Sequence, residues 1–194
     1  MKIIVSTDNR HKLQEIREML GFVAEIVSKT EAGFGDVYVV EDGDSLEANA
    51  IKKVEPLEGE VVIGDDTGLF VDALDGAPGV YSSRYSGADG DDAKNRAKLL
   101  RAMEDAQCRD AHFTTVIAVK KKDGTIYTVE GTVYGTIAER ERGEDGFGYD
   151  ALFIPEGSDR TFAEMQADEK NACSHRRRAL DALKKSLLEI GEKI

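Results

Sequence analysis

The order of apolar patterns along the chain constrains its fold more than any other feature. Residues 2–6 form a short apolar run typical of a buried strand, and after a polar turn the apolar residues up to Leu20 follow helical spacing. A second helix and a second strand follow, because Ser45 can cap a helix and residues 61–64 form a second apolar run. This alternation of strands and helices is typical of an α/β protein.

The second half of the chain has a different pattern. Residues 69–74 indicate a further strand, and residues 75–90 are so rich in Gly and Pro that no regular structure is expected there. A helix is predicted from about residue 91 to 105, and a last helix after Ser174. Between them, two β-rich runs are joined through residues 122–124, Lys-Asp-Gly, a strong hairpin signal. The sheet is therefore predicted to be mixed.

Length and composition suit a globular protein. The chain has 194 residues, of which 41% are hydrophobic, enough to bury a sizeable core. It shows no linker or repeat, so we expect a single domain over residues 1–194, or two tightly joined lobes. The amino terminus soon turns polar, unlike a signal peptide, and no run approaches the ~18 apolar residues of a membrane span. We therefore expect no membrane association and a cytoplasmic location. Cys108 and Cys173 lack metal-ligand spacing, which argues against zinc and suits a reducing compartment.

The net charge limits the class of partner. At −12 the chain is unsuited to nucleic acid, whose phosphate backbone requires a broad basic face. A small polyphosphate remains compatible with the composition. It would require a local cluster of Lys and Arg, and a divalent cation to neutralise neighbouring carboxylates.

Residues 6–12, STDNRHK, lead from the first predicted strand into the first predicted helix. Backbone N–H groups at a helix start, together with Lys12, favour an anion such as phosphate. The alternative is an ordinary capped helix with solvated Arg10 and Lys12. The segment is therefore a candidate phosphate site.

Two adjacent carboxylates follow the apolar run 61–64, in the sequence GDDTG. Ligands of α/β sheets gather at this end of a strand. Neighbouring residues of a strand point in different directions, so Asp65 and Asp66 need not do the same work. A turn built from Asp and Gly is the alternative. The Asp-x-Asp spacing of a haloacid-dehalogenase-type phosphatase is not present here.

An acidic segment precedes the second predicted helix. Its carboxylates could complete an oxygen shell for Mg²⁺, although their spacing excludes an EF-hand. For most of them a solvated loop is the better interpretation, and Glu41 is the one that we retain. The four residues are Glu41, Asp42, Asp44 and Glu47.

Two later segments have the composition of a base site. Residues 146–150, GFGYD, place aromatic rings beside a carboxylate, which can hold a nucleobase or can equally be core packing at a bend. Residues 170–178 gather Lys, His and Arg around a predicted helix start, where cations favour anions or carbonyl oxygens. Some of Arg176–Arg178 must instead be solvated, since three consecutive residues cannot share one helix face.

Taken in order, these segments resemble the inosine triphosphate pyrophosphatase family, the deaminated-purine nucleoside triphosphate pyrophosphatases. The resemblance covers nearly the whole chain, from STDNRHK through DSLEANA, GDDTGLFVDALDGAPGVYSSRYSG and GFGYDALF to AEMQADEKNACSHRRRAL. It implies an elongated, two-lobed α/β fold with a long mixed β-sheet flanked by helices, an active-site cleft between the lobes, and a homodimer. It also implies Mg²⁺-dependent hydrolysis of ITP, dITP, XTP and dXTP to the monophosphate and pyrophosphate, before these nucleotides enter DNA or RNA.

The resemblance also implies residue roles. Asp66 and Lys12 are the implied catalytic residues; Asp66 accepts a proton from the attacking water and holds Mg²⁺ together with Glu41. Lys53 and Arg84 are further cationic contacts, and Asp65 is a supporting carboxylate. Residues 7–12 contact the triphosphate, and Phe147 stacks on the base. The implied substrate contacts are Thr7, Asp8, Asn9, Arg10, His11, Lys12, Thr67, Phe147, Gly148, Tyr149, Asp150, Lys170, His175 and Arg176.

The sequence departs from the family pattern at three places. Thr67 replaces the usual Ser but keeps its hydroxyl, so binding should survive. Arg10 and His11 stand before Lys12 where the family often has a small residue, which leaves the shape of that loop open. Ser83 replaces the commoner Ala before Arg84, a change that we expect to be neutral.

Two other functions remain open. A Maf-like nucleotide pyrophosphatase would prefer methylated pyrimidine triphosphates to ITP. A regulatory module would bind a nucleotide without turning it over. The presence of Glu41 and Asp66 together with Lys12 argues against the second, because binding alone needs no positioned base.

Overall fold

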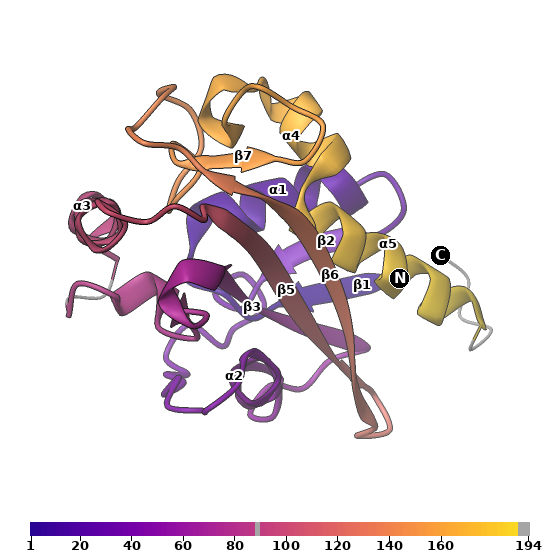
Figure 1. The fold of residues 1–194 in the computed structure, drawn as a ribbon. Coiled ribbons are helices and arrows are strands. Elements are labelled where there is room, and N and C mark those ends of the chain that lie inside the picture. Colours follow the sequence, from indigo (N-terminus) through magenta and orange to yellow (C-terminus); the bar gives the residue numbers. More distant parts are fainter. Residues whose placement is uncertain (88–89, 190–194) are drawn as a thin grey trace. The chain divides into compact units, whose positions relative to one another are not determined.

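The computed structural model describes residues 1–87 and 90–189, and its strands form one seven-stranded sheet (Figure 1). The strand order is β2-β1-β3-β5-β6-β7, with β4 paired to β3. The strands are β1 (Lys2–Val5), β2 (Glu25–Ser28), β3 (Val61–Val71), β4 (Pro78–Gly79), β5 (Asp110–Lys121), β6 (Ile126–Ile137) and β7 (Phe153–Pro155). The α-helices are α1 (Arg10–Leu20), α2 (Leu46–Val54), α3 (Asp92–Ala102), α4 (Ala167–Cys173) and α5 (His175–Glu189).

The pairing of the strands is mixed. β1 runs parallel to both β2 and β3, as expected when helices connect neighbouring strands. β4 is antiparallel to β3, and β7 is antiparallel to β6. The predicted α/β class with a mixed sheet flanked by helices is confirmed.

The chain forms two compact units. Unit 1 contains residues 1–66, 115–131 and the described residues from Arg176 onward; unit 2 contains residues 67–114 and 132–175. Strands β3, β5 and β6 each contribute residues to both units. The single domain over residues 1–194 and the cleft between lobes stay predictions.

Unit 1 has a core between its part of the sheet and two helices. Figure 1 shows α1 and α5 on one side of β1 and β3, and α2 on the other. Buried side chains at the spacing of one helix face, such as Ile16 in α1 and Leu183 in α5, meet alternate residues of the strands, such as Ile3 and Ile63. The predicted amphipathic helices are confirmed.

Gly64 lets α2 lie directly against β3. A Cβ at Gly64 would come within 2.7 Å of the Cβ of Lys53 and 3.1 Å of the carbonyl oxygen of Ala50. The close approach fixes the height of α2 along the strand. It thereby places Lys53 beside the residues that follow Gly64.

Unit 2 has its own core, which is rich in aromatic residues. The ring of Phe113 packs against those of Phe153 and Phe162, with centroids 4.8 and 6.4 Å apart. Leu99 of α3 and Met103, the C-cap residue of that helix, join this cluster. The core supports residues 146–150, whose Tyr149 is buried in it.

Side-chain caps begin three of the helices. Asn9 caps α1, Ser45 caps α2 and Asp91 caps α3. Each side-chain oxygen accepts a backbone N–H of the first turn, which has no partner within the helix. The cap predicted at Ser45 is confirmed.

Three local predictions are wrong. Residues 61–64 and 69–71 belong to one strand, β3, because Asp65 and Asp66 find buried partners and extend the strand instead of breaking it. Residues 75–90 include β4 and a 3₁₀ helix, Ser82–Arg84; Ala88 and Asp89 of this loop lie outside the described residues. Lys170 is predicted to lie near the start of the last helix. It lies instead within a separate helix, α4, which Glu169 helps to start through a capping box.

The described helices are shorter or more polar than a membrane span requires. Within residues 1–87 and 90–189, none is long and apolar enough to cross a bilayer. Both cysteines are free thiols.

Candidate active site

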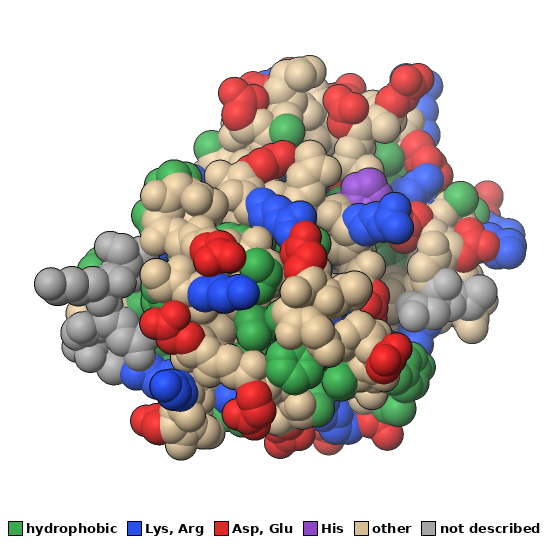
Figure 2. Space-filling model, turned by 180° about the vertical axis from the view of Figure 1, so that it is seen from behind, with side chains coloured by type: hydrophobic (Ala, Val, Ile, Leu, Met, Phe, Trp, Pro, Cys, Tyr) green, Lys and Arg blue, Asp and Glu red, His purple; other side chains and the backbone are tan. Residues whose placement is uncertain are grey.

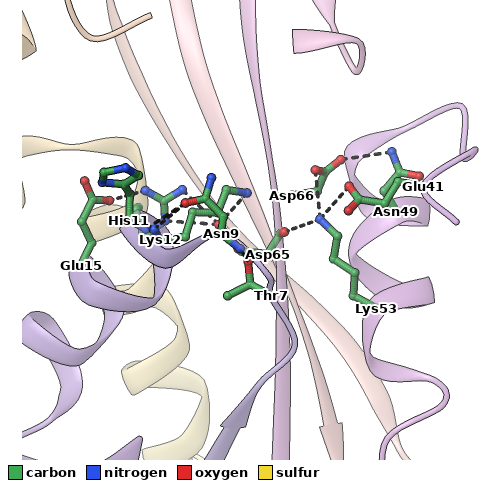
Figure 3. A network of polar contacts seen from close by, with 11 residues as sticks. Thr7, Asn9, His11, Lys12, Glu15, Glu41, Asn49, Lys53, Asp65 and Asp66 are labelled. Carbon is green, nitrogen blue, oxygen red and sulfur yellow. Dashed lines mark hydrogen bonds and ion pairs between the residues drawn. The ribbon is translucent and has the colours of Figure 1, made fainter. Parts of the chain in front are cut away.

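Asp65 and Asp66 direct their carboxylates to different partners from the middle of β3 (Figure 3). Successive side chains of a strand point to opposite faces, so the two acids separate although they are neighbours. Asp65 meets residues of α1 and α5, and Asp66 meets residues of α2. Both are buried, with relative exposures of 2% and 8%. A buried carboxylate needs compensation, and each acid has its own.

Asp65 lies between two cations. Its Oδ2 is 3.2 Å from Lys12 Nζ and accepts hydrogen bonds from Nη2 and Nε of Arg176, at 3.0 and 3.2 Å. Arg176, itself 1% exposed, also binds Glu15 of α1. These four residues form one buried ionic cluster, all within unit 1.

Burial and neighbouring charges shift the pKa values in this cluster. Burial acts to raise the pKa of Asp65, but Lys12 and Arg176 outweigh it and the pKa is lowered. Burial lowers the pKa of Lys12, and the attraction of Asp65 only partly opposes this effect. Asp65 is therefore a fixed anion that holds the desolvated ammonium of Lys12, a residue of α1, beside β3.

Asp66 shares its cation with Glu41. Its Oδ2 accepts a hydrogen bond from Asn49 Nδ2 at 3.1 Å, and its Oδ1 is 3.3 Å from Lys53 Nζ. Glu41 Oε2 lies 2.8 Å from the same ammonium, which also donates to the carbonyl oxygen of Asp65 at 2.8 Å. Burial acts to lower the pKa of Lys53, but the carboxylates of Asp66 and Glu41 outweigh it and raise it.

The two carboxylates predicted to bind a metal thus converge on one positive group. In the described part of the chain, no three His, Cys, Asp or Glu side chains gather as a ready-made metal cage. Mg²⁺ does not require one, since it commonly takes one or two carboxylates and completes its shell with water and substrate phosphates. The pair Glu41 and Asp66 fits that pattern, because both already lie around a cation.

Residues 7–12 are held by their own side chains. Asn9 Oδ1 accepts the backbone N–H groups of His11 and Lys12 at 3.0 and 3.1 Å, and Thr7 Oγ1 accepts that of Asn9. The expectation that these N–H groups lie open to an anion is therefore wrong for His11 and Lys12, because the Asn9 cap uses them. The side chain of Lys12 remains the main cationic group of the turn.

Other residues of the predicted phosphate segment lie at the surface. Arg10 and His11 are exposed. Asp8 is exposed too, but its carboxylate is 2.7 Å from the ammonium of buried Lys29. Lys29 also donates to the carbonyl oxygen of Val37 at 3.0 Å. Asp8 therefore ties the turn to the loop after β2.

In unit 2, residues 147–150 form a compact loop. Asp150 Oδ2 accepts the backbone N–H of Phe147 at 2.8 Å and is 2.7 Å from Lys170 Nζ. The same ammonium lies 4.7 Å from the centroid of the Phe147 ring. Tyr149 donates its hydroxyl to the carbonyl oxygen of Ser82 at 2.8 Å, and burial raises its pKa. An aromatic ring, a carboxylate and an ammonium are thus brought together.

The remaining predicted residues have other surroundings. His175 stacks on Phe113 with centroids 4.6 Å apart and is 3% exposed. Arg176 follows it and binds Asp65 and Glu15. Thr67 is half-buried in β3. Arg84 lies over the ring of Tyr81, 5.0 Å from its centroid.

Comparison with known proteins identifies the family. The model of the Ham1 family matches residues 3–186. This chain belongs to the Ham1 family. The resemblance predicted from the motifs is confirmed.

Relatives of the Ham1 chain match it over nearly its full length. A protein of Leuconostoc mesenteroides named dITP/XTP pyrophosphatase is 45% identical and covers 96% of each chain. One of Clostridium perfringens with the same name is also 45% identical, covering 96% of this chain and 97% of the relative. The solved structure of the Staphylococcus aureus Ham1 protein superimposes with a TM-score of 0.86 at 36% identity, over all of both chains.

Sequence reasoning missed polar residues that contact the predicted ones within each unit of this Ham1 chain. Asn49 lies one turn before Lys53 on the buried face of α2, a spacing that could have indicated it. Glu15 lies one turn after Lys12 in the same way. Asp92 and Arg96 of α3 bind the loop at Gly148, and no local signal connects them to a loop about fifty residues later.

Proposed function

We propose that this chain hydrolyses deaminated purine nucleoside triphosphates, ITP, dITP, XTP and dXTP, to the monophosphate and pyrophosphate. Such a reaction removes these nucleotides from the pool before they enter DNA or RNA. The names of the relatives support the substrate class. The observation that carries the chemistry is that two neighbouring carboxylates have different partners. Asp65 pairs with Lys12, and Asp66 lies with Glu41 around Lys53.

In this mechanism the nucleophile is water. Asp66 is held from two sides by Asn49 and Lys53, so its carboxylate is positioned to orient a water and accept its proton. Charge spreads over the phosphoryl oxygens as the bond between the α- and β-phosphates breaks, and Lys12 stabilises that charge. The mechanism needs no covalent intermediate, and pyrophosphate leaves as the second product.

Glu41 and Asp66 would hold Mg²⁺. When bound, the ion neutralises charge on the phosphates and lowers the cost of bringing them close to the carboxylates. Lys53 supplies positive charge at the same place and limits repulsion between the two acids. The relative positions of Asn49 and Lys53 on α2 keep Asp66 oriented.

The base is proposed to stack on Phe147 beside Asp150 and Lys170. Hypoxanthine and xanthine carry a carbonyl oxygen at position 6, where adenine carries an amino group. Donors from Lys170 or His175 would pair only with the former, whereas Arg176, also expected as a substrate contact, is held by Asp65 and Glu15. A buried donor left facing an amino group costs about 1–3 kcal/mol, which disfavours ATP.

The assembly and location are part of the same proposal. We expect a homodimer in the cytoplasm, where free thiols such as Cys108 and Cys173 persist. On the face shown in Figure 2, Lys and Arg side chains are interspersed with Asp and Glu. This mixture and the net charge of −12 disfavour a nucleic-acid partner and suit a small triphosphate.

The test is pyrophosphate release from ITP, dITP, XTP, ATP and GTP, with and without Mg²⁺. The native chain should act on ITP, dITP and XTP, and Asp66→Asn should lower kcat by roughly 100- to 10,000-fold. Asp42→Asn is the matched control, because Asp42 pairs with exposed Lys52 in the same acidic segment. Equal rates on ATP would overturn the base selectivity. Binding without release would favour a regulatory module, and preference for methylated pyrimidines a Maf-like activity.

A further inference from the structure

Helix α3 holds both backbone polar groups of Gly148. The N–H of Gly148 donates to Asp92 Oδ2 at 2.7 Å, and its carbonyl oxygen accepts from Arg96 Nη1 at 2.9 Å. Asp92 and Arg96 are four residues apart, so they project from one face of the helix. All three residues belong to unit 2.

The two side chains of this clamp are themselves constrained. Arg96 Nε is 3.0 Å from Glu141 Oε2, and the Arg96 side chain is only 19% exposed. Asp92 lies in the first turn of α3, but the helix cap is supplied by Asp91, which accepts the N–H of Lys94 at 3.0 Å. The hydrogen bond from Asp92 is thus directed to the loop.

Gly148 stands between the two rings of the loop. Its φ is +59°, in the left-handed region that glycine adopts readily, so the loop can turn between them. On one side Phe147 is held through its N–H by Asp150, and on the other Tyr149 is held through its hydroxyl by Ser82. The peptide groups on both sides of Gly148 therefore have fixed orientations. Release of the clamp would free the peptide next to the Phe147 ring.

We propose that Asp92 and Arg96 are positioning residues that determine nucleobase specificity through the backbone of Gly148. This inference rests on the proposed function, in which the ring of Phe147 stacks on a hypoxanthine or xanthine. One charge-assisted bond to each of the two peptide groups that flank Gly148 fixes the ring at the geometry that stacking requires. The phosphate-binding residues of unit 1 do not depend on this clamp.

The test separates binding of the base from binding of phosphate. Asp92→Ala and Arg96→Met should weaken binding of IMP, and raise KM for ITP, roughly ten-fold, because each leaves a backbone group of Gly148 without its charged partner. Inhibition by inorganic pyrophosphate and kcat should stay within about two-fold of the native values. The preference for ITP over ATP in kcat/KM should shrink. Asp92→Asn keeps an acceptor oxygen and should restore most of the IMP affinity.

A double-mutant cycle tests whether the clamp acts through Phe147. Asp92→Ala combined with Phe147→Ala should bind IMP no more weakly than Phe147→Ala alone. Lys94→Gln is the control on the same helix, since Lys94 is exposed and pairs with Asp91. If Asp92→Ala does not fold, Arg96→Met and Asp92→Asn carry the same comparison.

Three results would overturn the inference: additive losses in the cycle, equal losses of IMP and pyrophosphate binding, or no loss of IMP binding in Asp92→Ala and Arg96→Met. Failure of the proposed function looks different. In that case the native chain itself releases no pyrophosphate from ITP or XTP, while its affinity for IMP still reports on the clamp.

Discussion

Asp65 and Asp66 are neighbours in β3, yet they bind different lysines: Asp65 lies 3.2 Å from Lys12 Nζ, and Asp66 lies 3.3 Å from Lys53 Nζ. The alternation of a strand separates them, so one dipeptide serves two charge clusters. In the proposed reaction, one cluster stabilises the phosphates and the other holds the water and the metal. The two residues should therefore respond differently to the same substitution.

Replacing Asp65 by Asn should destabilise the fold. The change keeps the shape of the side chain but removes the anion between Lys12 and Arg176, and breaking a buried ion pair of this kind costs about 3–5 kcal/mol. Urea unfolding measures the loss. Asp42→Asn, whose side chain is 69% exposed, should change the free energy of unfolding by less than about 0.5 kcal/mol. Equal losses in the two variants would show that the buried cluster contributes little.

The sequence predicted elements better than it predicted contacts. In unit 1, apolar spacing located β1, α1, α2, α5 and the start of β3, since periodicity records which face is buried, but it did not indicate the short strand β2. It fails at Asp65 and Asp66, because two adjacent polar residues predict the end of a strand that in fact continues through them. Their buried partners come from α1, α2 and α5, and such compensation is visible only once the chain is folded.

The candidate site shows the same limit. The motifs indicated the segments that bear Lys12, Glu41 and Asp66, because residue type and order are local. They could not show that Asn9 occupies two N–H groups of the turn, or that Arg176 binds Glu15. Those interactions depend on side-chain direction, which spacing in the sequence does not determine.

Adding a methyl group at Gly64 should displace α2. The new Cβ would lie 2.7 Å from the Cβ of Lys53 and 3.1 Å from the carbonyl oxygen of Ala50, so Gly64→Ala should cost about 1–3 kcal/mol. Because Lys53 moves with the helix, kcat should fall as well. Thermal unfolding and pyrophosphate release measure the two effects. Gly35→Ala meets only Thr30, whose nearest atom is the side-chain Cγ2 at 3.3 Å, and should cost less; similar losses there would contradict the packing argument.

Glu31 should make stability depend on pH in the acid range. The backbone N–H of Ser28 and the guanidinium of Arg17 lower the pKa of Glu31 to about 2. Since the folded pKa lies below the unfolded value of about 4.3, the ionised form stabilises the fold above that pH. The contribution is lost as the pH falls toward 2. Glu31→Gln should therefore be less stable than the native chain at neutral pH, and urea titrations should converge near pH 2. A difference that does not change with pH would contradict this assignment.

Replacing Glu41 by Gln should change the requirement for Mg²⁺ more than the rate at saturation. Glu41 shares the ammonium of Lys53 with Asp66, so the substitution removes half of the negative charge proposed to hold the ion. The Mg²⁺ concentration for half-maximal activity should rise by about ten-fold or more. Chelation of Mg²⁺ should abolish pyrophosphate release in both proteins.

The comparison with Asp66→Asn shows whether Asp66 accepts the proton of the attacking water or only binds the metal. Excess Mg²⁺ should restore Glu41→Gln to within a few-fold of the native kcat, because its carboxylate is not needed to accept the proton. It should not restore Asp66→Asn, in which the proposed base itself is missing. If excess Mg²⁺ rescued both variants equally, Asp66 would be a metal ligand alone, and the group that accepts the proton would have to lie elsewhere in the site.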